Sequence, residues 1–491
     1  MYLLRLWKVE TENSYKKIVN SLKRRKKGST AADICASTAL PLYTVNELLP
    51  KAADEYSGHL RVTQSGEILY YFPNGFASRF HGFGVSLKKI TDKTTSFVRS
   101  SLVFLFKVWI MVMLIGYFVL FIALALATVF IQIAAKSNKD SDRGGGINFS
   151  AFDLLWRIWF YQQLTRPLNN YPGNIKWKDK EKKRPMHKAI FSFVFGEDDP
   201  NKNFDDQINK AVISFLQANR GVISLAEYMA FTGENSLDAE KSILSFCSKF
   251  NGSPEVTEEG TIVYRFEEIL LRSDTNKNSE LIPPIKRLKI FSGNSKKMNG
   301  LFIAINAVNL LFGSYFFYQS FAAGQMIHNF ISETAYSLYG YTHYFLHFII
   351  NEPHNFIRIV LGLVPLLFSL FFWIIPAMRN ILEKKENEGI KLLNFKRFSF
   401  SKIWSSPLNI DINNIQTSLP ECRPKDIAAA SDRVIKDIGA ISSPEILMAE
   451  SGKTIYSFNK LEKEKITLEK YRSGIDTSRL QLGGTVFDSG R

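Results

Sequence analysis

The sequence of 491 residues predicts a multi-domain α+β membrane protein in which copies of one small module alternate with transmembrane helices. The first observation is a recurring motif, in which a glycine turn is followed by an aliphatic residue and then by Tyr-x-Phe. It occurs at 62–72, at 256–266 and, more weakly, at 448–458. The second observation is a set of long apolar runs at 101–135, 301–321 and 356–378. A recurring motif indicates a duplicated unit, and apolar runs of roughly 20 residues or more are long enough to cross a membrane.

The first two copies of the module predict three helices followed by a β-hairpin. They align without a gap from about residue 16 to residue 72, at a constant offset of 194 residues. Apolar residues at helical spacing predict the first helix, and Ser224 and Ser236 are candidate N-caps of the next two helices in the second copy. Three helices and a hairpin are the element order of the winged helix. The fold prediction is therefore winged-helix repeats alternating with transmembrane helices, with a partial third copy.

The hairpins are predicted to turn at three glycines, Gly66, Gly260 and Gly452. Gly66 and Gly260 are expected to have a positive φ, which glycine adopts without strain. Alternation of apolar residues along the strands turns one side of each hairpin inward. The residues expected in the core on this ground are Tyr70, Tyr264 and Phe266.

The motif and the apolar runs divide the chain into consecutive regions. In order, these are a first winged-helix module (1–75), a basic linker (76–100), a membrane helix or re-entrant hairpin (101–135), a linker with an aromatic interfacial helix and a basic stretch (136–190), a second winged-helix module (191–272), a transmembrane helix (298–323), an extracytoplasmic loop (324–355), a transmembrane helix (356–378) and a cytoplasmic tail with a partial third module (379–491).

The apolar run at 101–135 is compatible with one long tilted helix or with a re-entrant hairpin near Gly116. About 35 helical residues span about 52 Å, which exceeds a hydrocarbon core of about 30 Å. Two modules in one compartment need an even number of crossings between them, which favours the hairpin. The side of the membrane on which the first module lies stays open.

Charges orient the last two apolar runs. The loop at 324–355 contains no Lys or Arg, whereas both outer flanks are rich in them. By the positive-inside rule, the loop lies outside and the flanks lie in the cytoplasm. The first residues have the features of neither a secretory signal nor a transit peptide, which favours a multi-pass protein of a bacterial inner (cytoplasmic) membrane.

The formal net charge of +16 predicts anionic partners. An aromatic segment at 149–164 and a basic stretch at 176–188 are typical of contact with anionic lipid headgroups. The predicted third helices are near neutral or acidic, and phosphate repulsion opposes docking of such helices on DNA. The expected partners are the lipid bilayer and an unidentified protein or a second copy, and nucleic acid is not expected. A basic cluster that ends the first helix is a candidate contact for phosphate or lipid: Lys23, Arg24, Arg25, Lys26 and Lys27.

No catalytic or nucleotide-binding motif occurs in the sequence, which predicts neither an enzyme nor a resident cofactor. His343 and His347 are four residues apart on a predicted helix, a spacing that metal sites use. The alternative is that both are interfacial residues of a tyrosine-rich loop. The three cysteines are isolated from one another, and each is expected to be a small buried hydrophobic residue: Cys35, Cys247 and Cys422.

Three stretches carry a resemblance to a known family. Residues 191–201 read Phe-Ser-Phe-Val-Phe-Gly-Glu-Asp-Asp-Pro-Asn, residues 142–146 read Asp-Arg-Gly-Gly-Gly, and residues 254–266 contain the second motif. The chain resembles an uncharacterised family of membrane proteins from cyanobacteria, other bacteria and chloroplasts with repeated winged-helix modules. The family has no established activity. Some plant members carry an iron–sulfur cluster biosynthesis label, for which the isolated cysteines supply no ligand set.

The sequence predicts a non-enzymatic, polytopic membrane protein that presents cytoplasmic winged-helix modules for protein–protein interaction, as a scaffold or regulator. Two alternatives stay open. One is a membrane-tethered DNA-binding transcription regulator, which an exposed basic cluster beside the first module's third helix would favour. The other is a metal- or haem-handling membrane protein that uses His343 and His347.

Overall fold

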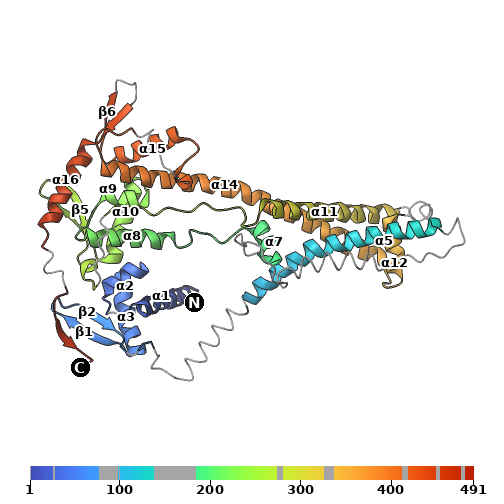
Figure 1. The fold of residues 1–491 in the computed structure, drawn as a ribbon, viewed down its shortest axis with the longest axis horizontal. Coiled ribbons are helices and arrows are strands. Elements are labelled where there is room, and N and C mark those ends of the chain that lie inside the picture. The colour runs from blue at the N-terminus through green and yellow to red at the C-terminus, as the bar shows by residue number, and fades with distance from the viewer. Residues whose placement is uncertain are drawn as a thin grey trace, which may run out of the picture. The chain divides into compact units, whose positions relative to one another are not determined.

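The structure is a computed structural model that describes residues 2–25, 28–73, 75–76, 98, 100–137, 184–273, 280–325, 337–411, 419–448, 454–476 and 482–490. These residues form a mostly helical α+β protein with small sheets (Figure 1). The chain divides into two compact units. Unit 1 comprises Met1–Thr95, Asp198–Lys289 and Ile381–Arg491, and unit 2 comprises Ser96–Glu197 and Ile290–Asn380.

Unit 1 contains segments in which helices precede a β-hairpin. The first helix–hairpin segment (residues 2–71) consists of α1 (Tyr2–Arg24), α2 (Ala31–Thr38), α3 (Leu42–Glu55), β1 (His59–Thr63) and β2 (Ile68–Tyr71). The second helix–hairpin segment (residues 204–265) consists of α8 (Phe204–Ala218), β3 (Val222–Ser224), α9 (Leu225–Thr232), α10 (Ser236–Phe250), β4 (Ser253–Val256) and β5 (Ile262–Arg265), and the short turn η2 (Glu268–Leu270) follows it.

The first two hairpins pair in the same register. Leu60 lies opposite Tyr70 in the first, and Pro254 lies opposite Tyr264 in the second. The numbers of equivalent residues differ by 194 in both strands, which is the offset found in the sequence. The likeness of the two sequence stretches therefore extends to their backbone pairing.

The third helix–hairpin segment (residues 381–457) begins with the end of α14 (Val364–Ser405). The elements η6 (Pro420–Cys422), α15 (Ile427–Gly439), β6 (Glu445–Met448) and β7 (Thr454–Ser457) follow. Ile410 bridges Tyr456 of this hairpin, as Ser29 bridges Tyr70 and Ile223 pairs with Tyr264. The sequence predicts only a partial copy here. The structure places a first helix in α14, which the sequence hides because this helix continues directly from an apolar run.

The local sequence explains where the helices of the second segment begin. Ser224 is the N-cap of α9, as predicted, and its hydroxyl accepts the N–H of Glu227 at 3.3 Å. The prediction that Ser236 caps α10 is wrong. The N-cap is Asn235, whose side-chain oxygen accepts the N–H of Asp238 at 2.9 Å. Asn and Ser are both favoured N-caps, so two adjacent candidates cannot be separated by residue type alone.

The three segments share one hydrophobic core. Gly66 and Gly260 both have a φ of +83°, the left-handed conformation expected of a glycine turn. Gly452 lies outside the described residues. The three residues that the motif predicts in the core are all buried: Tyr70, Tyr264 and Phe266.

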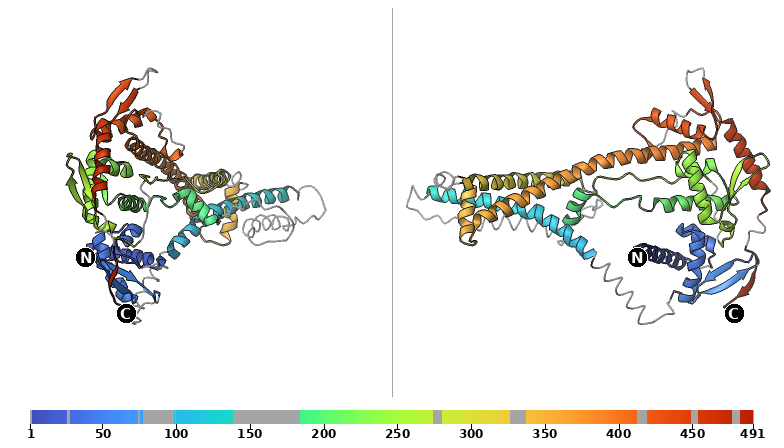
Figure 2. Two further views of the ribbon diagram at one scale, coloured as in Figure 1. Left: turned by 60° about the vertical axis from the view of Figure 1, so that its left-hand side comes forward. Right: turned by 180° about the vertical axis from the view of Figure 1, so that it is seen from behind.

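Two later elements complete unit 1, the helix α16 (Asn459–Gly474) and the strand β8 (Thr485–Asp488). The strand pairs antiparallel with β1, so the first hairpin becomes a sheet of order β2-β1-β8. Figure 2 shows this strand beside the hairpin near the C-terminus. No sequence pattern predicts it, because Leu60 and the Ser489 that bonds to it are 429 residues apart.

Three helices in the described part of the chain are long and apolar enough to cross a membrane: Ser100–Ile133, Lys296–Ala322 and Pro353–Ser405. The first contains η1 (Val112–Gly116) and most of α5 (Tyr117–Ser137). The second is part of α11 (Lys296–Gln325), and the third contains α13 (Pro353–Phe356), η4 (Ile357–Leu363) and α14. Unit 2 also contains α7 (Met186–Phe195) and α12 (Leu338–His347). The aromatic segment at 149–164, the linker at 77–97 and most of the basic stretch at 176–188 lie outside the described residues.

The first apolar run forms one continuous helix, so the alternative of a re-entrant hairpin is wrong. The residues that flank Gly116 keep helical backbone angles, with φ −65° and ψ −41° at Tyr117. A break in an apolar segment leaves backbone N–H and C=O groups without partners. The chain instead accommodates this region with one wider π-helical turn at Val112–Gly116.

Polar side chains from neighbouring helices compensate the wider turns. A π-helical turn disturbs the regular hydrogen-bond ladder and leaves carbonyls available. The amide of the buried Asn309 donates to the carbonyl of Leu114 in η1 at 2.8 Å. The hydroxyl of Tyr117 donates to the carbonyl of Val360 in η4 at 2.9 Å. These bonds connect the apolar helices of unit 2.

Candidate interaction surfaces

The second helix of the first two segments begins with a capping box. In α2, the Thr30 hydroxyl accepts the N–H of Asp33 at 3.2 Å, and the Asp33 carboxylate accepts the N–H of Thr30 at 3.0 Å. Ser224 and Glu227 make the same reciprocal pair in α9. Such a box satisfies N–H groups that a helix start leaves without partners. Both carboxylates are buried, with Asp33 2% exposed and Glu227 1% exposed.

Each of these carboxylates also holds a later part of the chain. Ser273 donates its N–H to Asp33 at 3.0 Å and its hydroxyl at 2.6 Å. Arg472 donates to Glu227 at 2.7 Å. Ser273 follows the second hairpin, and Arg472 follows the third. A buried carboxylate of the first segment thus binds the residue that follows the second segment. A buried carboxylate of the second segment binds a residue of α16, which follows the third segment.

The helix α16 lies against the second segment. The carbonyls at a helix C-terminus lack intrahelical partners, and a cationic side chain satisfies them well. The guanidinium of Arg220 has this role, because it donates to the carbonyls of Arg472, Ser473 and Ile475 at 2.8, 2.8 and 3.0 Å. An exposed ion pair between Lys470 and Glu259 adds a contact at the turn of the second hairpin.

The carboxyl of Glu464 makes the stability of the contact between α16 and the second segment depend on pH. Burial raises its pKa to about 7, the hydrogen bond from Ser224 and the charge of Lys460 oppose that rise, and the charge of Glu227 adds to it. The docked helix therefore binds the proton more tightly than a free glutamate with a pKa of 4.5 does. The stabilisation from this proton is complete below the free value, and it is lost as the pH rises towards 7.

The substitution Glu464→Gln is expected to remove this pH dependence, because a neutral amide needs no proton. The free energy of unfolding of the wild-type protein should fall by at most about 3 kcal/mol between about pH 5 and pH 8 through this group. Thermal unfolding at a series of pH values measures the slope. Glu462→Gln removes a charge from the same helix and should keep the wild-type slope. A wild-type slope in Glu464→Gln would contradict the assignment.

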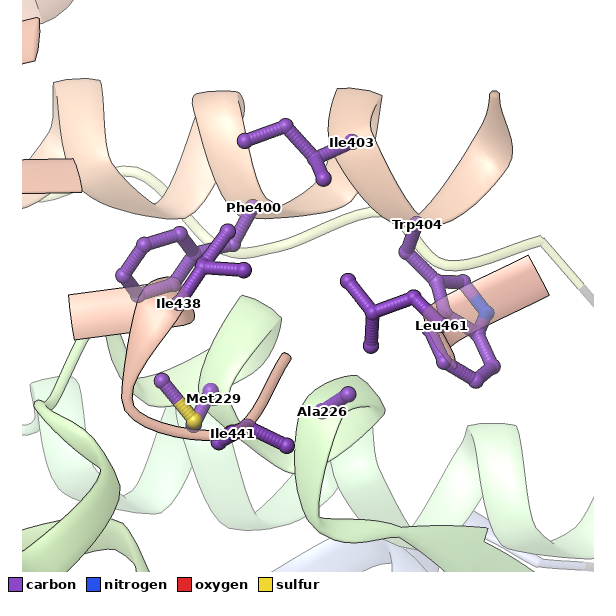
Figure 3. A pocket seen from close by; sticks show the side chains of 8 residues that line it. All are labelled: Ala226, Met229, Phe400, Ile403, Trp404, Ile438, Ile441 and Leu461. Atoms are coloured by element: carbon purple, nitrogen blue, oxygen red, sulfur yellow. The ribbon is translucent and has the colours of Figure 1, made fainter. Parts of the chain in front are cut away.

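A small apolar pocket lies where the second and third segments meet α16 (Figure 3). Ala226 and Met229 of α9 lie on one side, and Phe400, Ile403 and Trp404 of α14 lie on the other, with apolar side chains of α16 and the end of α15 between them. Its lining offers no group for acid–base or nucleophilic chemistry. The pocket is a packing junction between segments.

The second and third hairpins carry exposed apolar side chains. Val256 and Ile262 face each other across β4 and β5 and are 68% and 55% exposed. Ile446 and Met448 lie on one face of β6 and are 65% and 84% exposed. The turn of the second hairpin reads Glu-Glu-Gly260. Exposed apolar groups are typical of protein contacts, whereas contact with DNA needs cationic and polar groups at phosphates.

The basic cluster lies near the C-terminal end of α3. The ammonium of Lys23 is 5.8 Å from the ring centroid of Tyr56, which is the C-cap of that helix. Arg25 pairs with the buried Asp33 at 3.3 Å and so has a role within the segment. Arg24 is exposed. Recognition helices contact bases with their N-terminal residues, and α3 also contacts α10 of the second segment. Lys26 and Lys27 lie outside the described residues.

His343 and His347 lie one turn apart on α12. The ring of His343 stacks on Tyr339 with centroids 6.2 Å apart, and the Tyr339 hydroxyl bonds to Nδ1 of His354 at 2.8 Å. Burial, together with the charges of His354 and His347, lowers the pKa of His343. Within the described ranges, no group of three His, Cys, Asp or Glu side chains is placed to hold a metal ion. Among the described residues, the pair is therefore not joined by the further protein ligand that a metal site uses.

The three cysteines are buried and separate, in α2, α10 and η6. Burial raises the pKa of Cys35 to about 12 and that of Cys247 to about 11, so both are thiols at neutral pH. Iron–sulfur clusters are held by several thiolates together. These thiols have the role predicted from their isolation, that of small buried side chains: Cys35, Cys247 and Cys422.

The residues that join the segments were not singled out from the sequence. Thr30 with Asp33 and Ser224 with Glu227 fit the pattern of a capping box, so a search for that pattern before an apolar run finds both carboxylates. No such signal marks Arg472, which lies 245 residues beyond Glu227. The partner of a cap carboxylate depends on tertiary packing.

These features define a class of protein, a mostly helical α+β chain with three helices able to cross a membrane and small sheets. Over 412 residues, the chain is 24% identical to an uncharacterised chloroplastic protein of Arabidopsis thaliana, in an alignment that covers 77% of this chain and 70% of the plant protein. No family model matches the chain, and no solved structure matches it. The similarity is consistent with the family resemblance seen in the sequence, and it brings no activity with it.

Proposed function

We propose that this chain is a multi-pass membrane protein whose three helix–hairpin segments are winged-helix modules that bind other proteins, as a scaffold or regulator without catalytic activity. The order of elements supports the winged-helix assignment, because helices precede a hairpin in each segment. The common bridge to the hairpin tyrosine supports it further. The membrane is proposed to be the bacterial cytoplasmic membrane. Cell fractionation distinguishes this location from the chloroplast, which the name of the Arabidopsis relative gives for that protein.

The contacts within unit 1 support a location of all three modules on one side of the membrane. The bonds from Ser273 to Asp33 and from Arg472 to Glu227 join them directly. A shared side requires an even number of crossings between the first and second modules. The described residues between them contain one helix long enough to cross, Ser100–Ile133, so the proposal requires a second crossing between residues 134 and 203. Basic residues flank the apolar parts of α11 and α14 on the sides that face away from the intervening loop. The positive-inside rule then assigns the modules to the cytoplasm.

The observation that carries the protein-binding role is the chemistry of the exposed hairpins. Ile446 and Met448 are uncharged and largely exposed on one strand of the third hairpin. Val256 and Ile262 of the second hairpin are also exposed, and they face each other across its two strands. A DNA-binding wing needs cations at the phosphates. The free energy falls when a protein surface covers apolar side chains in these positions.

The double substitution Ile446→Ser and Met448→Ser is expected to remove the protein partner of the third hairpin. Crosslinking and mass spectrometry of the tagged full-length protein in its native cell measure the contact. Crosslinks from this hairpin should fall by about tenfold or more, as expected for apolar anchors of an interface. Ile466→Ser changes an apolar side chain of α16 that is 58% exposed and should leave them unchanged.

Chromatin crosslinking of the same tagged protein tests the DNA-binding alternative. A flat profile, beside a known regulator that gives peaks, agrees with the proposal. Reproducible peaks that disappear when the basic cluster is changed to alanine would overturn it and indicate a tethered transcription regulator. The cluster to change is Lys23, Arg24, Arg25, Lys26 and Lys27.

A further inference from the structure

The outer edge of β1 holds the strand β8 mainly through its backbone. The N–H of Leu60 donates to the Ser489 hydroxyl at 2.8 Å, and the N–H of Ser489 donates to the carbonyl of Leu60 at 2.9 Å. At the other end, the N–H of Gln64 donates to the carbonyl of Gly484 at 2.9 Å. Val486 and Phe487 of β8 are 69% and 57% exposed. Because these side chains stay in solvent, hydrophobic burial contributes little to holding the strand.

One side chain of β8 is recognised specifically. The carboxylate of Asp488 accepts the Nε–H of Arg61 at 2.7 Å and the hydroxyl of Tyr71 at 2.6 Å. The Arg61 guanidinium also lies over the Tyr71 ring, 4.1 Å from its centroid. The bond from Tyr71, the N–H of Gly490 and Arg61 together lower the pKa of Asp488 to about 2. The hairpin therefore has a built contact for one carboxylate on an added strand.

The equivalent edge of the second hairpin has the opposite properties. At the offset of 194 residues, Leu60 corresponds to Pro254 and Arg61 corresponds to Glu255. Proline has no N–H to donate to an added strand, and it is a common way to block an edge. Glu255 repels a carboxylate at the position where Arg61 attracts one. In the described residues, β4 pairs with β5 alone.

We propose that the outer edge of β1 is a strand-addition site for an extended peptide that carries an aspartate, and that residues 482–490 are its resident, exchangeable ligand. In strand addition, main-chain bonds supply affinity, and side-chain contacts select the sequence. The site selects an aspartate at the position of Asp488, followed by a residue whose hydroxyl accepts the N–H of Leu60, as Ser489 does. This inference rests on the proposed function, because it gives one protein-binding module a class of ligand.

The test uses the full chain lacking residues 482–491 and a fluorescent synthetic peptide of residues 482–490, with binding followed by anisotropy. The truncated chain is expected to bind the peptide saturably. The intact chain should bind it at least about tenfold more weakly, because its own segment is present at high effective concentration. In the truncated chain, Leu60→Pro and Arg61→Glu each give β1 a feature of β4. Each should weaken binding by about tenfold or more, since each removes a backbone or charge contact.

The inference is overturned if the truncated chain is folded, as shown by the same unfolding temperature as the wild type, and yet binds no peptide. Equal binding of a peptide with Asp488→Asn would also overturn it. If truncation prevents folding, hydrogen exchange of the intact chain decides. The amides of β8 should exchange faster than those that join β1 to β2, and equal protection would show that β8 is a fixed part of the sheet. Crosslinks of the third hairpin test the proposed function on another surface, so either idea can fail alone.

Discussion

Replacing Arg472 with alanine is expected to destabilise unit 1 by about 3–5 kcal/mol, the range for loss of one partner from a buried ion pair. Arg472 donates to Glu227 and to the carbonyl of Val222, both at 2.7 Å. Without the guanidinium, the carboxylate of Glu227 stays buried beside no cation of α16. Burial raises the pKa of Glu227, and Arg472 opposes that rise. The variant should therefore take up a proton at Glu227, and its deficit should shrink as the pH falls.

Chemical unfolding of the full-length protein at about pH 8 and pH 5.5, with hydrogen exchange of α9 and α16, measures this effect. Lys470→Ala is the matched control on the same helix. Its ion pair with Glu259 is largely exposed, with 68% of the Lys470 side chain in solvent. Such exposed pairs contribute little to stability, because solvent screens both charges. Equal losses in the two variants would show that Glu227 is not the group that anchors α16.

The substitution Phe266→Ala is expected to lower the free energy of unfolding by about 3–5 kcal/mol, the usual cost when a buried phenylalanine is removed from a core. Phe266 is fully buried and meets Phe246 edge-to-face, with ring centroids 5.4 Å apart. A Cβ added at Gly252 would lie 2.2 Å from its ring, so the backbone also approaches it closely. The cavity left by alanine cannot close without moving this backbone. Thermal or chemical unfolding measures the loss.

The equivalent residue of the first segment is the control. Phe72 is only half-buried, and it stacks on Phe76 at 4.4 Å. Phe72→Ala should cost roughly 1–2 kcal/mol, because less apolar area returns to water. The two residues occupy the same place in the motif, so the difference between the variants measures burial and not sequence position. A Phe72→Ala loss as large as that of Phe266→Ala would contradict the assigned burial.

The first two hairpins could be predicted well from the sequence. The register of Tyr70 and Tyr264, the turn at Gly66 and Gly260 and the burial of Phe266 all follow from a few neighbouring residues. Alternation in a strand and a glycine at a turn are local rules, and both hairpins obey them.

Other features were missed or wrongly predicted for physical reasons that can be named. The hairpin near Gly116 was favoured by a count of membrane crossings, but an apolar helix loses less by widening one turn than by exposing backbone groups. The first helix of the third segment was missed because α14 runs without a break from apolar to charged sequence. The predicted N-cap of α10, Ser236, is one residue away from the true N-cap, Asn235, because both residue types are suitable.

The sequence by itself determined the local units of this protein, namely its hairpins, their turns and cores, and its apolar helices. These depend on residues close together in the chain, whose spacing sets which side chains share a face. Only the tertiary structure decided which of these local elements contact one another. The pairing of Glu227 with Arg472 and that of Leu60 with Ser489 join residues 245 and 429 positions apart. A buried carboxylate or an open strand edge requires a partner, but no local pattern specifies where in the chain that partner lies.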